Sequence, residues 1–183
     1  MKYTSILHVF ILSFCLFMTE FTHATTSVCS PAGETDSLTI ERIKDKLTGE
    51  YLKEDLKIMK ADEREFLLEA ADINGDGNDE YFIGFFTSFY FCGSGGCSVY
   101  LLNNNLELVT AFSVSGESIY ILNDKTAGWN DLAIFSGGKY RQLKFNGAGY
   151  PENPSLCHAY SGKPEKNGVV IFDYEKEKKP IRF

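Results

Sequence analysis

The sequence predicts a mainly β protein of the α+β class, with antiparallel sheets and one N-terminal helix. Short runs of β-branched and aromatic residues are separated by glycine and asparagine turns, a pattern typical of antiparallel sheets. Apolar residues recur at helical spacing in residues 36–47, before those runs begin. Residues 25–35 are polar and predict an extension. Residues 36–183 have the length of a single β-rich domain that can bury a core.

Residues 1–24 have the pattern of a secretory signal peptide. Lys2 provides a positive start, residues 6–18 are mostly apolar, and Thr22-His23-Ala24 ends in a small residue. The apolar run is short for a bilayer span, although an uncleaved anchor is the alternative. We therefore expect a location in the periplasm or outside the cell, with no stable membrane anchor after cleavage.

The helix predicted over residues 36–47 has a plausible beginning and end in the sequence. Asp36 or Ser37 can cap its first turn, and Gly49 is expected to end it. Residues 51–60 fit a helix or a strand equally well. The helix is therefore followed by a segment whose structure the pattern leaves open.

The β part of the chain begins after a charged turn. Aromatic residues dominate its second run, and Asn146-Gly147 is a strong turn signal. A weak repeat aligns Glu80 with Asp131 and Ile83 with Ile134, which favours sheet units that hide each other's apolar faces. The predicted strands are residues 65–71, 81–91, 98–103, 106–114, 118–122, 131–135, 140–145 and 169–174.

The charge of the chain limits its partners. The formal net charge is −7, and the sequence contains no basic run. Nucleic acid is therefore excluded as an expected partner, because binding to phosphates requires clustered cations. A basic protein partner remains an option, and the same charge also serves solubility.

Four cysteines remain once Cys15 leaves with the signal peptide. An even number in an exported chain favours two disulfides. Cys92 and Cys97 enclose a glycine-rich turn that permits a short disulfide loop, which leaves Cys29 to pair with Cys157. A zinc site is the alternative, but suitably spaced histidines are missing from the sequence.

The stretch from Asp72 to Glu80 predicts a calcium site. Its candidate ligands are oxygen atoms at alternate positions, and Gly75 and Gly77 allow the backbone to curl around them. Calcium takes six to eight such oxygens in flexible geometry. A metal-free turn in which these side chains bond their own backbone is the alternative. The predicted ligands are Asp72, Asn74, Asp76, the Asn78 carbonyl and Glu80.

The context of this loop separates it from an EF-hand, whose twelfth position is a bidentate glutamate between helices. Here that position is Ile83, and the loop lies between predicted strands. The loop resembles the calcium loops of FG-GAP and VCBS-type repeats in β-propeller proteins. The resemblance implies part of a propeller-like arrangement with a structural ion, although this chain has one such loop and is too short for a closed seven-bladed propeller.

A wider resemblance covers most of the residues after 24. Small exported bacterial proteins of uncharacterised function carry a D-x-N-G-D-G-x-x-E loop, a C-G-x-G-G-C turn and a G-W-x-D-L segment. This chain has them at residues 72–80, 92–97 and 128–132. The resemblance supports the architecture and says almost nothing about activity.

Catalytic residues are hard to find in the sequence. His158 is the only histidine after the signal segment, and its neighbour Cys157 is expected to be in a disulfide. A Cys–His pair needs a free thiolate, so this pair is unfavourable. A hydrolase with unidentified carboxylates stays open in a chain with 25 acidic residues.

A second motif bears on binding. Ser136-Gly137-Gly138-Lys139-Tyr140 fits S-G-x-x-Y and resembles the signature of periplasmic lysozyme inhibitors, in which the serine and tyrosine contact the enzyme. The alternative is a simple turn in which Tyr140 begins a strand. The sequence therefore predicts a non-enzymatic exported binding module with a protein as its candidate partner. The alternative is an inhibitor or immunity protein that acts on a cell-wall hydrolase.

Overall fold

The computed structural model describes residues 35–116, 118–173 and 179–183, and these residues form a mainly antiparallel β structure. The predicted fold class is confirmed. The predicted signal peptide, Cys29 and most of the extension lie outside the described residues. The strands are β1 Glu65–Ala71, β2 Glu80–Gly84, β3 Cys92–Gly93, β4 Gly96–Leu102, β5 Leu108–Ser115, β6 Ile119–Thr126, β7 Trp129–Ser136, β8 Lys139–Leu143, β9 Gly168–Phe172 and β10 Ile181–Arg182. The helices are α1 Ser37–Lys46, the π-helical turn η1 Leu47–Tyr51, the 3₁₀ turns η2 Asp55–Lys57, η3 Ala61–Glu63 and η4 Pro154–Leu156, and α2 Pro164–Asn167.

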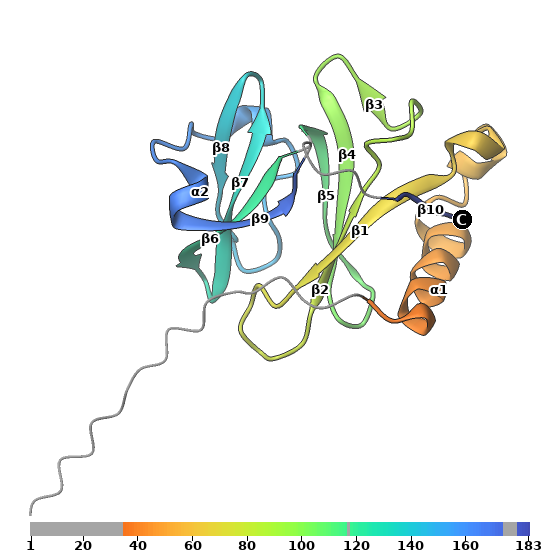
Figure 1. Ribbon diagram of the computed structural model, residues 1–183, viewed down its shortest axis with the longest axis horizontal. Coiled ribbons are helices and arrows are strands. Elements are labelled where there is room, and N and C mark those ends of the chain that lie inside the picture. Colours follow the sequence, from red (N-terminus) through yellow and green to blue (C-terminus); the bar gives the residue numbers. More distant parts are fainter. Residues whose placement is uncertain (1–34, 117, 174–178) are drawn as a thin grey trace, which may run out of the picture.

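The strands form two open sheets that stand side by side (Figure 1). The first sheet has the order β10-β1-β2-β4, with β3 and β5 both paired to β4. The second sheet has the order β8-β7-β6-β9. All strand pairs are antiparallel. Each sheet thus adds a C-terminal strand to the outer side of its first strand, β10 beside β1 and β9 beside β6.

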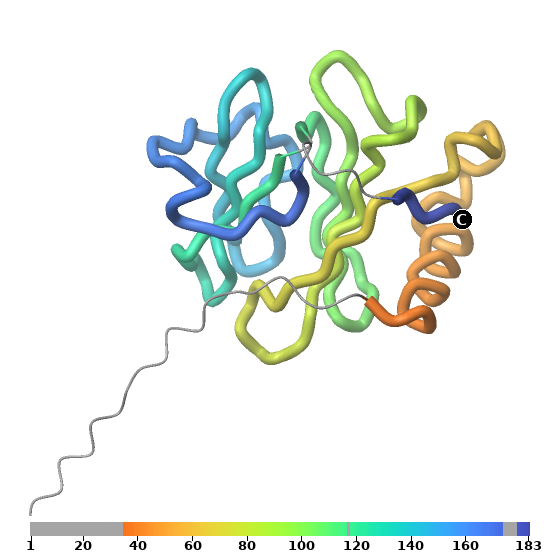
Figure 2. The backbone as a smooth tube through the Cα atoms, viewed as in Figure 1, coloured from red at the N-terminus to blue at the C-terminus, as the bar shows by residue number. Residues whose placement is uncertain are grey.

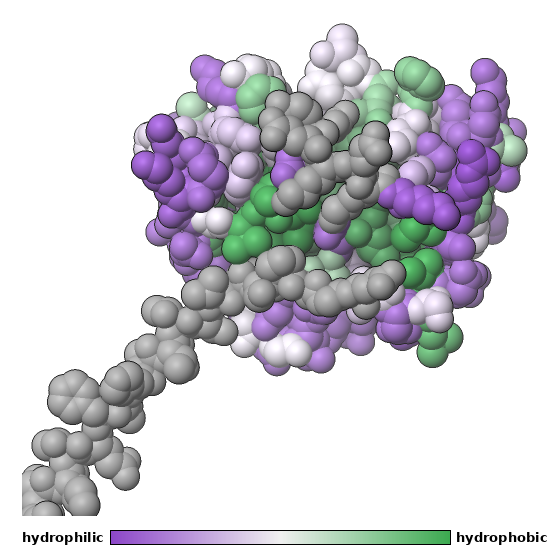
Figure 3. Space-filling view, in the orientation of Figure 1, coloured by the Kyte–Doolittle hydropathy of each residue, from purple (hydrophilic) through white to green (hydrophobic). Residues whose placement is uncertain are grey.

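The main hydrophobic core lies between the two sheets. Phe82, Leu101 and Phe112 from the first sheet join Leu132 and Phe172 from the second, and all are buried. In Figure 3 apolar residues gather over the middle of the molecule, and hydrophilic residues surround them. Burial of apolar surface stabilises the arrangement, because neither sheet can hide its inner face alone.

The first sheet is also covered on its outer face by α1 (Figure 1). Ile43 and Leu47 from the helical region pack against Phe66, Ile83 and other buried residues in a second hydrophobic cluster. Neighbouring residues of β2 therefore serve different cores, since Phe82 faces the second sheet and Ile83 faces the helix. This double burial explains why β2 is almost continuously apolar.

The predicted beginning of the helix is confirmed. The Oδ1 atom of Asp36 accepts hydrogen bonds from the backbone N–H groups of Leu38 at 2.9 Å and Thr39 at 3.0 Å. The prediction that Gly49 ends the helix is wrong, because a π-helical turn continues through it to Tyr51. The burial of Leu47 and Leu52 in the outer cluster holds this extra turn in place.

The prediction of a long strand over residues 81–91 is only half right. The strand ends at Gly84, and the following residues form turns in which Ser88 N–H donates to Phe85 O and Phe91 N–H donates to Ser88 O. The Phe85 and Phe91 rings then pack on each other with their centroids 4.2 Å apart and their planes tilted by 30°. Aromatic content predicted a strand here, whereas packing of the rings on each other bends the chain.

None of the helices in the described parts of the chain is long and apolar enough to cross a membrane.

Candidate metal centre

The candidate metal centre is the loop between β1 and β2, residues 72–79, which Figure 2 shows at the lower end of the first sheet. Gly75 and Gly77 have φ angles of +83° and +87°, a region that favours glycine. Ile73 turns inward and is completely buried in the core between the sheets. The loop is therefore a fixed part of the fold, with an apolar anchor inside a polar turn.

Side chains of the loop accept hydrogen bonds from its own backbone. The carboxylate of Asp72 accepts from Gly75 N–H at 2.6 Å and from Gly77 N–H at 3.0 Å. The Oδ1 atom of Asn74 accepts from Asp76 N–H at 2.7 Å. These contacts are the side-chain turns that the metal-free alternative predicts. They shape the loop without using all the lone pairs of its oxygens.

Asp76 and Asn78 continue the same pattern. The Oδ1 atom of Asp76 accepts from the backbone N–H of Asn78 at 2.8 Å and from its Nδ2 at 3.1 Å. The backbone N–H of Asn78 is the main cause that lowers the pKa of Asp76. Burial, followed by the nearby negative charge of Asp72, raises the pKa of Asp79. The pKa values of these two carboxylates in one short loop are thus shifted in opposite directions.

Glu80 is the most unusual group of the centre, because its residue is only 1% exposed. Its carboxylate accepts from Ile73 N–H at 3.1 Å and from Asn74 Nδ2 at 3.0 Å. Burial raises the pKa of Glu80 to about 7; the Ile73 N–H opposes this shift, and the charges of Asp76 and Asp72 add to it. Ionised Glu80 is therefore held at a free-energy cost that a nearby cation would offset.

The amide group of Asn74 links two of the carboxylates. Its Nδ2 donates to Glu80 Oε1 and also to Asp76 Oδ2 at 3.1 Å. The amide hydrogens carry partial positive charge, so they take the position between the carboxylates that a cation would favour. For Asn74 to become an oxygen ligand, this amide would have to turn over.

The second sheet contacts the loop directly. Asn130 N–H at the start of β7 donates to the backbone oxygen of Ile73 at 2.8 Å. The ammonium group of Lys125 on β6 lies against Gly75, where an added Cβ would meet its nitrogen at 3.0 Å. The conformation of the loop is thus coupled to the contact between the sheets.

The donor set of the loop fits a hard cation in its chemistry, since carboxylate, amide and carbonyl oxygens suit calcium. The buried Glu80 at the base of the loop supports the same assignment. Within residues 35–116, 118–173 and 179–183, no three His, Cys, Asp or Glu side chains are gathered closely enough to share an ion. The loop would therefore have to contract around calcium, with Asp72, Asn74, Asp76, Asn78 and Glu80 as its ligands.

The predicted disulfide between Cys92 and Cys97 is confirmed. The two cysteines pair across β3 and β4, and Gly93 pairs with Gly96 beside them. The pairing of Cys29 with Cys157 remains a prediction, because Cys29 lies outside the described residues. Cys157 is half-buried near η4, and burial raises the pKa of its thiol.

The S-G-x-x-Y motif forms the tight turn between β7 and β8. Gly137 and Gly138, with φ angles of +60° and +79°, form the turn, and Ser136 pairs with Lys139. The side chain of Ser136 is turned inward: the residue is 2% exposed, and its Oγ donates to Val114 O at 2.6 Å. In this conformation the serine cannot contact a partner enzyme, whereas Tyr140 is half-buried and lines a pocket.

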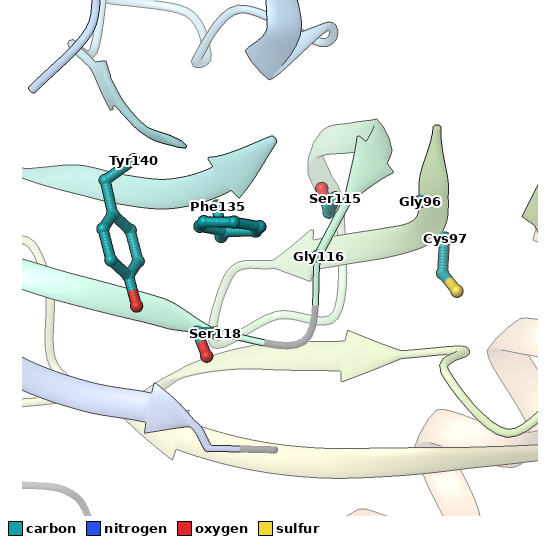
Figure 4. Close-up of a pocket in the computed structure, with 7 residues that line it drawn as sticks. All are labelled: Gly96, Cys97, Ser115, Gly116, Ser118, Phe135 and Tyr140. Carbon is teal, nitrogen blue, oxygen red and sulfur yellow. The ribbon is translucent and has the colours of Figure 1, made fainter. Parts of the chain in front are cut away.

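That pocket is formed by the start of β4 and the end of β5 from the first sheet and by residues of β7 and β8 from the second (Figure 4). Its volume is about 600 Å³. Its described lining residues are Gly96, Cys97, Ser115, Gly116, Ser118, Phe135 and Tyr140.

The sequence reasoning did not find the contacts that Lys125 and Asn130 make with the loop. Both residues follow it by about fifty positions, and nothing in local spacing relates them to it. The weak repeat that aligns Glu80 with Asp131 was the available signal. It makes the start of β7 in the second sheet equivalent to the start of β2 in the first sheet.

Comparison of the chain with protein-family models, curated proteins and solved structures finds no significant match.

Proposed function

We propose that this protein is an exported, non-enzymatic binding module whose two-sheet scaffold is braced by calcium in the loop from Asp72 to Glu80. The observation that supports this proposal most strongly is that Glu80, an almost fully buried carboxylate, ends a loop with two further candidate ligand carboxylates, Asp72 and Asp76. Calcium would offset their mutual repulsion and the burial of Glu80.

The position of the loop gives the ion a structural role. Ile73 lies in the core between the sheets and bonds Asn130 of the second sheet, so ordering the loop would stiffen the contact between the two sheets. The Cys92–Cys97 disulfide supports an oxidising compartment. There, sites with dissociation constants of about 10⁻⁴–10⁻³ M are filled by ambient calcium.

A calcium titration followed by calorimetry and thermal unfolding tests this function. At a calcium concentration ten times the dissociation constant, we expect about 1.4 kcal/mol of stabilisation, which corresponds to a rise of about 3–6 °C in Tm. Asp76→Ala should abolish both binding and the rise in Tm. Asp45→Ala, a change of an exposed aspartate in α1, is the matched control and should keep both.

A gain-of-function variant sharpens the test. Asn74→Asp replaces the amide that bridges Asp76 and Glu80 by a third negative charge at that point. We expect lower stability in chelator and calcium affinity stronger by about tenfold, or about 1.4 kcal/mol. Wild-type protein that shows neither heat of binding nor a change in Tm at millimolar calcium would refute the metal assignment.

A further inference from the structure

The turn at residues 146–149, which follows β8, contains one of three Asn–Gly pairs in the chain. The pairs are Asn74-Gly75, Asn146-Gly147 and Asn167-Gly168. In such a pair the asparagine side chain can react with the next backbone nitrogen, because glycine has no side chain that hinders the approach. The three pairs are alike in sequence, so their surroundings in the folded protein decide which of them reacts.

The reaction is deamidation, which converts asparagine to aspartate or isoaspartate. The glycine nitrogen bonds to Cγ of the asparagine and loses its proton, negative charge develops on Oδ1, and the Cγ–Nδ2 bond breaks with release of ammonia. Water then opens the resulting five-membered imide at either of its two carbonyls. The fold favours this reaction where the glycine N–H is free, Oδ1 receives hydrogen bonds and the backbone has room to adjust.

The pair Asn146-Gly147 meets these three conditions. The Oδ1 atom of Asn146 accepts hydrogen bonds from the backbone N–H groups of Ala148 at 2.9 Å and Gly149 at 3.0 Å, so two donors face the oxygen on which negative charge develops. These bonds curl the side chain over Gly147, whose N–H donates to none of the described residues. Both residues of the pair are exposed, and an added Cβ at Gly147 would meet no described atom within 4 Å.

Asn74 also precedes a glycine, but the loop holds both reacting groups. The N–H of Gly75 donates to Asp72 at 2.6 Å, so the attacking nitrogen is engaged. The Nδ2 atom of Asn74, which would leave as ammonia, donates to Asp76 and Glu80. Carboxylates around the pair also oppose the negative charge that develops on Oδ1. The loop therefore protects Asn74 from deamidation.

Asn167 is protected by its side-chain partners and by the sheet. Its Nδ2 donates to Asp124 Oδ2 at 2.7 Å and to the hydroxyl of Tyr160 at 3.1 Å. Gly168 begins β9 and pairs with β6, where an added Cβ would collide with the backbone oxygen of Ile121. The backbone at this pair is therefore fixed and cannot rotate to form the imide.

We propose that Asn146 is a site of spontaneous deamidation, and that the folded structure selects it over Asn74 and Asn167. Water is the only co-reactant, and ammonia is the product that leaves. The new carboxylate adds one negative charge to a chain whose formal net charge is −7. This site does not depend on the calcium assignment.

The turn also positions Tyr150, which is 4% exposed and lies in the core between the sheets. The backbone N–H of Tyr150 donates to Thr110 Oγ1 in the first sheet at 2.9 Å, and its hydroxyl donates to Asn130 O in the second sheet at 2.6 Å. Isoaspartate adds one carbon to the backbone of the turn. Deamidation should therefore weaken a contact that joins the two sheets.

Peptide mapping by mass spectrometry tests the proposal on the full chain. The protein is incubated in mildly alkaline buffer made with water labelled with heavy oxygen, so that each newly formed aspartate or isoaspartate carries the label. We expect Asn146 to react about tenfold faster than Asn74 or Asn167 in the folded protein. In urea, which removes the surroundings of all three pairs, the rates should lie within about threefold of one another.

Two results of this experiment would overturn the proposal. One is a rate at Asn74 or Asn167 in the folded protein that equals or exceeds the rate at Asn146. The other is the absence of labelled product at Asn146 in the folded protein under conditions in which the chain in urea reacts.

A variant tests the consequence for the contact between the sheets. Asn146→Ser removes the amide and keeps a side-chain oxygen that can accept hydrogen bonds in the turn. Once Asn146 is modified, the Tm of wild type should fall by about 2–4 °C, whereas the same incubation should leave the Tm of Asn146→Ser unchanged. Asn104→Ser, a change of an exposed asparagine that does not precede glycine, is the matched control and should lose Tm like wild type. An equal loss of Tm in Asn146→Ser would overturn this consequence.

Discussion

The two sheets contain the same strand–turn–strand unit with different connections. In the first sheet an eight-residue loop joins β1 to β2, whereas in the second only Ala127 and Gly128 join β6 to β7. A buried acid stands near the start of the second strand of each unit: Glu80 in β2 and Asp131 in β7, both 1% exposed. The difference between the units therefore lies in what surrounds the acid.

The hydrogen-bond donors to Glu80 come from its own loop, whereas the hydrogen-bond donor to Asp131 lies on the neighbouring strand β8. Asp131 Oδ2 accepts from Gln142 Nε2 at 2.9 Å and lies 3.9 Å from Lys144 Nζ. Its Oδ1 is buried and finds no hydrogen-bond donor among the described residues. A buried carboxylate alone is thus no sign of a metal; the long oxygen-rich loop distinguishes the first unit from the second.

The largest effect should come from the apolar anchor of the loop. Ile73→Ala removes a completely buried side chain from the core between the sheets and should lower the free energy of unfolding by about 2–5 kcal/mol. Urea denaturation measures this change. Ile58→Ala, at a site 74% exposed, should change stability by less than about 0.5 kcal/mol. Equal effects of the two variants would mean that the loop is not anchored between the sheets.

The next effect concerns the acid of the second unit. Gln142→Ala removes the donor to buried Asp131 and should lower the free energy of unfolding by about 1–3 kcal/mol. Calcium should not restore the lost stability, because this unit has no oxygen-rich loop. A Gln142→Ala protein that calcium restores to wild-type stability would erase the distinction between the two units.

The pH dependence of stability should differ between wild type and Glu80→Gln. Folding raises the pKa of Glu80 from 4.5 to about 7, so the folded state binds this proton more tightly than the unfolded state. The associated stability is fully present below about pH 4.5 and is lost as the pH rises through about 7. In chelator we expect wild type to lose about 1–2 kcal/mol more than Glu80→Gln over this range, after allowance for solvent screening.

Urea denaturation at several pH values measures that difference. Calcium should remove it in wild type, because a bound cation favours the ionised carboxylate. Parallel pH curves for wild type and Glu80→Gln in chelator would contradict the raised pKa.

The smallest effect should come from Lys144→Ala. The Lys144 side chain is 61% exposed, so its interaction with Asp131 is screened by water and should contribute less than about 1 kcal/mol. Comparison with Gln142→Ala by urea denaturation separates the two groups that face Asp131. A larger loss of stability for Lys144→Ala than for Gln142→Ala would mean that the charge of Lys144, and not the hydrogen bond from Gln142, is the main interaction that stabilises Asp131.

Local patterns were sufficient for the fold class and for several elements. The Asp36 cap, the strand Glu65–Ala71 and the Cys92–Cys97 pair all depend on neighbours within a few residues, so their residue types predicted them. The strand predicted over residues 81–91 was too long, because the chain turns after Gly84 and the Phe85 ring packs on the Phe91 ring. Periodicity does not distinguish an aromatic run that extends from one that folds back.

For the candidate site, too, the sequence predicted the local features and not the contacts between the sheets. Oxygen donors and glycines identified the loop, because a turn is shaped by its own side chains. Its contacts with Lys125 and Asn130, the burial of Glu80 and the inward orientation of Ser136 depend on how the sheets meet.

The order of polar and apolar residues along the chain therefore determined on its own that antiparallel strands form, that an oxygen-rich turn joins two of them, and that a short disulfide closes another turn. The packing of one sheet against the other decided which acids are buried and where a pocket opens. Short-range geometry is encoded in adjacent residues, whereas burial arises only when segments distant in the sequence exclude water together.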